Sequence, residues 1–168
     1  MKIKVALCAM VACIVSAVAL GQQVSVNYNH SQDFSQFKTY AWGSNNANQI
    51  QNSILAQQAK SDVDQALQGK GLQMVQESEN PNLIVTENGG LKQQTSYTAM
   101  GMGRGFGGGM GTISPEQSEV GTLIIDLYDA KAKGLVWRGI AQDTLSTNGG
   151  KNAKTVQKAI QKMFKQYP

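Results

Sequence analysis

Residues 121–142 read GTLIIDLYDAKAKGLVWRGIAQ, and this stretch decides the predicted fold. Its first half alternates apolar and polar residues, as a half-buried strand does, the apolar ones being Leu123, Ile125 and Leu127. A turn is predicted over residues 129–134, after which the chain returns as a second strand over residues 135–141. The stretch therefore predicts a β-hairpin.

The rest of the chain supplies shorter strands and two helices. Strands are predicted around residues 24–28, 38–42, 72–76 and 83–87. From about Ala47 the apolar period becomes helical, and this helix ends at the glycines of residues 69–71. A second apolar stripe predicts a C-terminal helix and consists of Val156, Ile160, Met163 and Tyr167.

Strand runs interrupted by two helices and containing a hairpin favour an α+β fold. We expect one mostly antiparallel sheet of about five or six strands, with both helices packed on one face. A long glycine-rich segment, about residues 89–119, is predicted to be a flexible loop. Residues 22–168 are expected to form a single domain.

The first 21 residues resemble a secretory signal peptide. Lys2 and Lys4 precede an apolar run, and small residues lead to a predicted cleavage site between Gly21 and Gln22. The run is shorter than a bilayer-spanning helix needs. Cys13 follows a weak lipobox-like sequence, so lipidation there is a less favoured alternative. We expect an exported protein of the periplasm or the extracellular space.

Cleavage would change the charge and the cysteine content. Removing Lys2 and Lys4 from the 15 basic residues leaves 13 against 11 acidic ones, a net charge of +2. This balance gives no support for nucleic-acid binding. Both cysteines, Cys8 and Cys13, lie in the leader, which excludes disulfides and thiolate chemistry from the remaining chain.

The segment TAMGMGRGFGGGMGT, residues 98–112, contains the strongest candidates for a contact site. Residues 103–108 fit G-x-G-x-x-G, but proline and a strand follow where a phosphate-binding helix would have to begin. Soft thioethers suit Cu(I), which makes weak metal candidates of Met100, Met102 and Met110. Flexible glycines with soft apolar side chains also suit a partner contact, with the candidates Met102, Arg104, Phe106 and Met110.

Two further features carry structural predictions. Asp126 and Arg138 fall on the two arms of the predicted hairpin and are expected to pair across the strands. Trp42 and Trp137 are expected to lie in the core or half-buried on the sheet. Four C-terminal lysines, Lys154, Lys158, Lys162 and Lys165, fall nearly on one helical face, which is typical of a solvated surface.

Three segments resemble the domain of unknown function 4136 family of bacterial exported proteins, many of them lipoproteins. They are DFSQFKTYAWG (33–43), GTLIIDLYDAKAKGLVWRG (121–139) and KAIQKMFKQYP (158–168). The resemblance is most specific in the hairpin, at Gly121, Thr122, Leu123, Asp126, Asp129, Trp137, Arg138 and Gly139. The chain lacks a clear lipidated cysteine and has Asn82 where members tend to carry an acidic residue. The resemblance implies a compartment and a fold but no reaction.

No familiar catalytic motif occurs in the sequence, and His30, its single histidine, lies in a polar turn. We therefore expect a non-enzymatic binding module without a cofactor, whose partner is an envelope protein or surface component. A carrier of a small molecule or of Cu(I), using the Met/Gly loop, is the alternative. An envelope enzyme with an unrecognised site is the third possibility.

Overall fold

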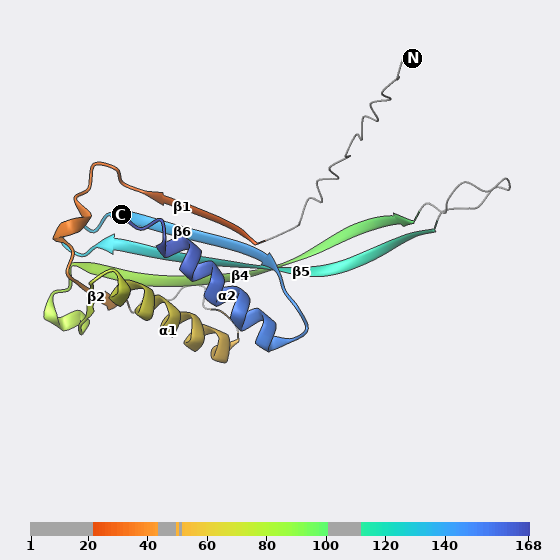
Figure 1. Ribbon diagram of the computed structural model, residues 1–168, viewed down its shortest axis with the longest axis horizontal. Helices are drawn as coiled ribbons and strands as arrows, with labels where there is room; N and C mark the ends of the chain where they lie inside the picture. The colour runs from red at the N-terminus through yellow and green to blue at the C-terminus, as the bar shows by residue number, and fades with distance from the viewer. Residues whose placement is uncertain (1–21, 44–49, 51, 101–111) are drawn as a thin grey trace, which may run out of the picture.

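The computed structural model describes residues 22–43, 50, 52–100 and 112–168 (Figure 1). The order of elements is the one that the sequence predicts, with two 3-10 turns in addition. The strands are β1 (Gln23–Tyr28), β2 (Thr39–Trp42), β3 (Gln73–Met74), β4 (Leu83–Met100), β5 (Thr112–Asp129) and β6 (Leu135–Thr144). The helices are α1 (Ser53–Gly69) and α2 (Gly149–Phe164), and the 3-10 turns are η1 (Phe34–Gln36) and η2 (Glu77–Glu79).

The fold is α+β, with one six-stranded sheet in the order β1-β6-β5-β4-β2-β3. The sheet is mixed rather than mostly antiparallel, because β2 runs parallel to both β3 and β4. The reason lies in α1, which carries the chain back across the sheet so that β3 starts at the same end as β2. The other pairings, β1–β6, β6–β5 and β5–β4, are antiparallel.

Both helices cover the same face of the sheet (Figure 1). The predicted strand face with Leu123, Ile125 and Leu127 is buried beneath them. From the helices, Val63 and Leu67 of α1 and Ile160 and Met163 of α2 are fully buried against it. This alternation of buried and half-exposed residues along the strands is what fixes the sheet register, since a one-residue slip would expose the apolar set.

Side-chain caps fix where the two helices begin. The Asn52 side chain accepts a hydrogen bond from the Leu55 amide (3.0 Å), and that of Asn148 accepts from Gly150 and Lys151. These bonds satisfy amides that have no partner within the helix. α1 ends at the predicted glycines, where Gly71 has φ +85°, a conformation that favours glycine.

The segment predicted as a long loop is largely a β-hairpin. β4 continues to Met100 and β5 starts at Thr112, and their register runs unbroken from Leu83↔Asp129 to Met100↔Thr112. The expectation of a loop was wrong for residues 89–100 and 112–119, whereas residues 101–111 lie outside the described part of the chain. The reason is that residues 90–96 and 115–117 are exposed on both faces of the ribbon. Such strands show no apolar alternation, which is the usual sign of a strand in a sequence.

Candidate functional site

The outer half of the β4–β5 hairpin projects beyond the rest of the domain (Figure 1). β6 pairs with β5 only as far as Val120, and β2 pairs with β4 only over residues 83–85. Apart from a hydrogen bond from the Leu145 amide to the Glu119 carbonyl (2.7 Å), residues 93–100 and 112–119 are therefore paired only with each other. We call this ribbon the arm. At about 3.3 Å per residue the arm is roughly 25 Å long. Residues 93–96 and 115–117 are exposed, so this part of the arm buries no core of its own.

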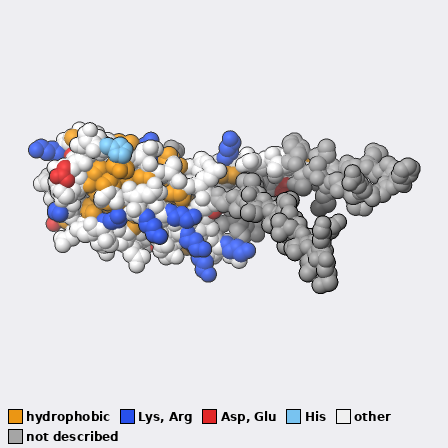
Figure 2. All heavy atoms as spheres, turned by 45° about the horizontal axis from the view of Figure 1, so that its top comes forward, with side chains coloured by type: hydrophobic (Ala, Val, Ile, Leu, Met, Phe, Trp, Pro, Cys, Tyr) orange, Lys and Arg blue, Asp and Glu red, His pale blue; other side chains and the backbone are white. Residues whose placement is uncertain are grey.

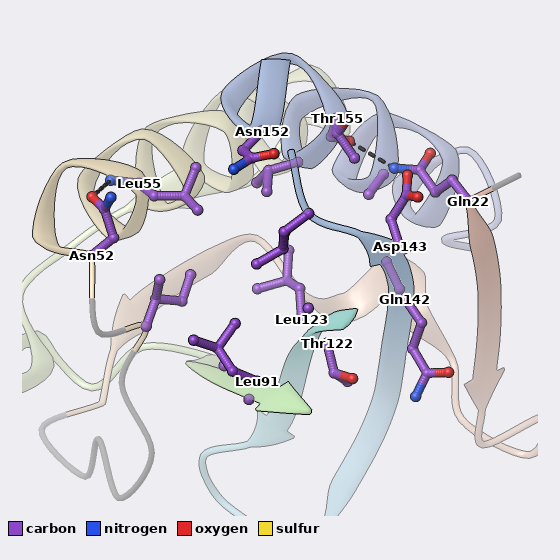
Figure 3. Close-up of a pocket in the computed structure, with 18 residues that line it drawn as sticks. Gln22, Asn52, Leu55, Leu91, Thr122, Leu123, Gln142, Asp143, Asn152 and Thr155 are labelled. Atoms are coloured by element: carbon purple, nitrogen blue, oxygen red, sulfur yellow. Dashed lines mark hydrogen bonds between the residues drawn. The ribbon is translucent and has the colours of Figure 1, made fainter. Parts of the chain in front are cut away.

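A cavity of about 550 Å³ lies at the base of the arm, between the sheet and the N-terminal turns of both helices (Figure 3). Leu91 and Leu123 point into it from β4 and β5, and Leu55 points into it from α1. Ile50 and Leu145 form walls. The Ile50 side chain lies so close to Gly89 that a Cβ there would come within 2.6 Å of it, and Leu145 covers Gly121 in the same way (2.9 Å).

The polar groups at the mouth of the cavity mostly serve the fold. Gln22 donates from its side-chain amide to the Thr155 carbonyl (2.7 Å), which ties the start of β1 to α2. The Asn152 side chain bonds both the amide and the carbonyl of Ser146 (2.8 Å each). Among the described residues that line the cavity, the single ionisable side chain is that of Asp143.

On the opposite face of the sheet, Asp126 and Arg138 form a bidentate ion pair. Arg138 Nε donates to Asp126 Oδ1 (2.6 Å), and Nη2 donates to Oδ2 (2.8 Å). Asp126 is 2% exposed, whereas the Arg138 side chain is 40% exposed, so the arginine covers the carboxylate. The hydrogen bond to Asp126 raises the pKa of Arg138 above its already high value. The register places the two residues directly opposite each other.

The remaining hairpin residues shape the strands. Trp137 is fully buried and stacks on Phe164 with ring centroids 4.9 Å apart. Gly139 leaves room for this packing, because a Cβ there would come within 2.7 Å of Trp137 and 2.8 Å of Met163. The Asp129 carboxylate accepts from the amides of Lys131 and Ala132 and so closes the turn. Gly121 and Thr122 line the cavity.

Trp42 lies half-buried over α1. Its ring nitrogen donates to Asp64 (2.8 Å), and the same carboxylate oxygen accepts from the Tyr40 hydroxyl (2.9 Å). Lys60 lies over the Trp42 ring at 4.9 Å from its centroid. These contacts join β2 to α1.

The lysines of α2 are exposed. Lys154, Lys158 and Lys162 are solvent-facing, as is Lys165 just beyond the helix. Figure 2 shows basic side chains in a row beside an apolar strip, with the single histidine near one end of that strip.

Glu87 is an acidic side chain on the helix-covered face of the sheet. Among the described residues its Oε1 is buried without a hydrogen-bond partner. Burial raises the pKa of the Glu87 carboxyl to about 7, and the charge of Lys60 opposes this shift.

This shift predicts a pH-dependent stability. Below about pH 4.5 the carboxyl is protonated in the folded and the unfolded chain alike. Between pH 4.5 and about 7 only the unfolded chain releases the proton, so the free energy of unfolding falls as the pH rises. Above that window the Glu87 carboxyl is ionised in both states, so the loss in free energy of unfolding stays constant. Since the group is partly exposed, this loss is about 1–2 kcal/mol.

Glu87→Gln is therefore expected to raise the free energy of unfolding by that amount at pH 8 and to have little effect at pH 4. Urea denaturation at both pH values measures this difference. Glu116→Gln, on the exposed arm, is the matched control and should change neither value. Equal effects of Glu87→Gln at both pH values would show that burial does not raise the pKa of Glu87.

Several predicted contact residues fall outside the described part of the chain. These are the candidates Met102, Arg104, Phe106 and Met110, and also Gly21 of the predicted cleavage site. Met100 ends β4, and Gln22 immediately precedes β1. Within the described residues, no three His, Cys, Asp or Glu side chains gather as a metal site would require. None of the described helices is both long and apolar enough to cross a membrane.

Comparison with known proteins places the chain among others of this fold. The family described as "Domain of unknown function (DUF4136)" matches residues 24–168. A DUF4136 family protein from Bacteroides thetaiotaomicron has a similar structure, with a TM-score of 0.57 at 15% identity, covering 88% of this chain and 96% of that one. No curated protein matches the chain.

Two other solved structures share the fold. A PDZ domain protein from Parabacteroides distasonis gives a TM-score of 0.56 at 17% identity over 88% of this chain. This chain spans 36% of the length of that protein. The PelC dodecamer from Paraburkholderia phytofirmans gives 0.50 at 14% identity, covering 84% of this chain and 94% of that one. At these identities the likeness concerns the fold alone.

Proposed function

The chain belongs to the DUF4136 family, whose description assigns no reaction, and from this premise we propose a binding function. We propose that the protein is an exported, non-enzymatic interaction module of the bacterial envelope that contacts a protein partner through the arm. The leader-like residues 1–21 support export. The observation that carries the proposed contact is the projection of the arm beyond the sheet and helices.

The energetics of the arm favour a partner. A two-stranded ribbon without a core is marginally stable in water at best, because ordering its backbone costs entropy that little buried surface offsets. Surface buried against a second protein would offset that cost. The exposed side chains of the arm, such as those of Gln94 and Gln117, do not pack in the core of the fold.

The arm also offers a specific way of binding. Over residues 93–100 and 112–118 each strand has one neighbour, so each has one open edge of carbonyl groups and, except at Pro115, amide groups. An extended segment of a partner can add to such an edge by main-chain hydrogen bonds. The Met- and Phe-containing residues 101–111, between the two strands in the sequence, would supply apolar side chains for the same contact.

Photo-crosslinking in intact cells tests the proposed contact. The photoreactive amino acid p-benzoylphenylalanine is introduced at Gln94 or Gln117 of the arm, or at Gln161 as the matched exposed control on α2. We expect a discrete adduct with one envelope protein from both arm positions and none from Gln161. Mass spectrometry of the adduct identifies the partner.

A further inference from the structure

We propose that the cavity at the base of the arm binds a small, elongated apolar molecule whose head group is neutral or cationic. The cavity is separate from the arm's exposed strands, so this inference stands independently of the partner contact proposed above.

Small residues from different parts of the sequence line the cavity. Gly89, Gly121 and Ala141 lie on three adjacent strands, and Ala159 faces them from α2. Ile50 and Leu145 cover the two glycines, whereas larger side chains at the two alanines would extend into the space. The hollow is open to solvent, since Leu91 in its lining is 56% exposed, so apolar surface there is left in contact with water. A bound apolar molecule would cover that surface.

Its size and lining fit a small organic ligand. The volume of about 550 Å³ falls within the roughly 300–1,000 Å³ that is typical of such pockets. Apolar side chains line it from both helices and the sheet, among them Leu55, Leu123 and Val156. Thr122 and Gln142 point away from the helices in Figure 3, so the helix-facing floor is left to the apolar side chains. An alkyl chain or aromatic ring suits this floor.

The charges at the mouth select the head group. Among the described residues, no lysine or arginine lines the cavity, and Asp143 is the single ionisable lining residue. One oxygen of Asp143 accepts from the Thr144 amide (2.7 Å), and among the described residues the other has no hydrogen-bond partner. A cationic head would gain from this carboxylate and a neutral head could be tolerated, whereas an anionic head would meet repulsion without a compensating cation.

Fluorescence of N-phenyl-1-naphthylamine with the purified protein tests the inference, because this neutral probe brightens in apolar surroundings. We expect saturable binding of one probe per chain. Ala141→Leu and Val156→Phe fill the cavity from β6 and α2, and each should weaken binding roughly tenfold or more while leaving the protein folded. Ala132→Leu, in the exposed β5–β6 turn, is the matched control and should bind as the wild type does.

Competition between the bound probe and compounds with differently charged head groups identifies the head group that the cavity accepts. Decyltrimethylammonium, below its micellar concentration, should displace the probe at several-fold lower concentration than decyl sulfate, which has the same chain. Asp143→Asn should remove this difference. Absence of saturable probe binding, or binding unaffected by both cavity-filling variants, would overturn the site. Equal competition by the two decyl compounds with the wild type would overturn the assigned ligand class.

Discussion

Gly139→Val is expected to lower the free energy of unfolding by about 3 kcal/mol or more, the largest effect of any single substitution considered. A Cβ at residue 139 would come within 2.7 Å of Trp137 and within 2.8 Å of Met163. Both side chains are fully buried, so neither can move into free space. Overpacking by even one methyl group costs typically about 1–3 kcal/mol, and valine adds more. For a chain of this length, a loss of about 3 kcal/mol corresponds to roughly 6–12 °C in melting temperature.

Thermal and urea denaturation measure the effect, with Gly90→Val as the matched control. Gly90 is also a strand glycine, but nothing lies within 4 Å of the position of its Cβ. Its substitution should change stability by no more than about 0.5 kcal/mol. Met163→Ala should recover part of the loss in Gly139→Val by giving the new side chain room. Similar losses from the two glycine substitutions would contradict the packing described around Trp137.

Arg138→Met is expected to cost about 2 kcal/mol, the next largest effect. The substitution keeps the apolar stem but leaves the carboxylate of Asp126, which is 2% exposed, without its cation. Removing one partner of a fully buried pair costs about 3–5 kcal/mol. Because 40% of the Arg138 side chain is exposed, water can reach the vacated space and reduce the loss.

A double-mutant cycle measures this pair. Asp126→Asn combined with Arg138→Met should be less damaging than the sum of the two single changes, because no uncompensated charge remains. Urea denaturation of the four proteins gives the coupling free energy, expected at about 1–2 kcal/mol. Strictly additive losses would show that the two hydrogen bonds between Asp126 and Arg138 do not contribute to the free energy of unfolding.

The core hairpin and both helices could be predicted from sequence because their apolar residues follow one period. Leu123, Ile125 and Leu127 alternate, since one face of β5 is covered by helices and the other is not. The spacing of Ile160 and Met163 likewise follows from a helix with one buried side. In these segments the residues that the apolar period marks are the ones buried in the fold, so the period alone suffices to predict the element.

The arm and the parallel strands could not be predicted in the same way. Residues 93–96 and 115–117 face solvent, so burial leaves no pattern in them. The parallel pairing of β2 with β3 and β4 depends on where α1 returns the chain, which no short segment encodes. β3 itself is formed by two residues, Gln73 and Met74, rather than the longer strand expected over 72–76.

The cavity was missed for a related reason. The residues that line it are far apart in sequence and become neighbours only in the sheet, as Gly121 and Leu91 do across β4 and β5. The glycine pair at residues 89 and 90 was the available signal, because glycine inside a strand often marks a close approach of another group. The Ile50 side chain does approach Gly89 in this way.

Crosslinking from the arm tests the proposed function most directly, since it asks whether the projecting strands touch a partner in the cell. The account predicts the same discrete adduct from Gln94 and Gln117, with no adduct from Gln161 on α2. Absence of an adduct from both arm positions, in a protein that is folded and exported, would contradict the arm as the contact element. An equal yield of the adduct from Gln161 would contradict it as well, because the contact would not then be specific to the arm.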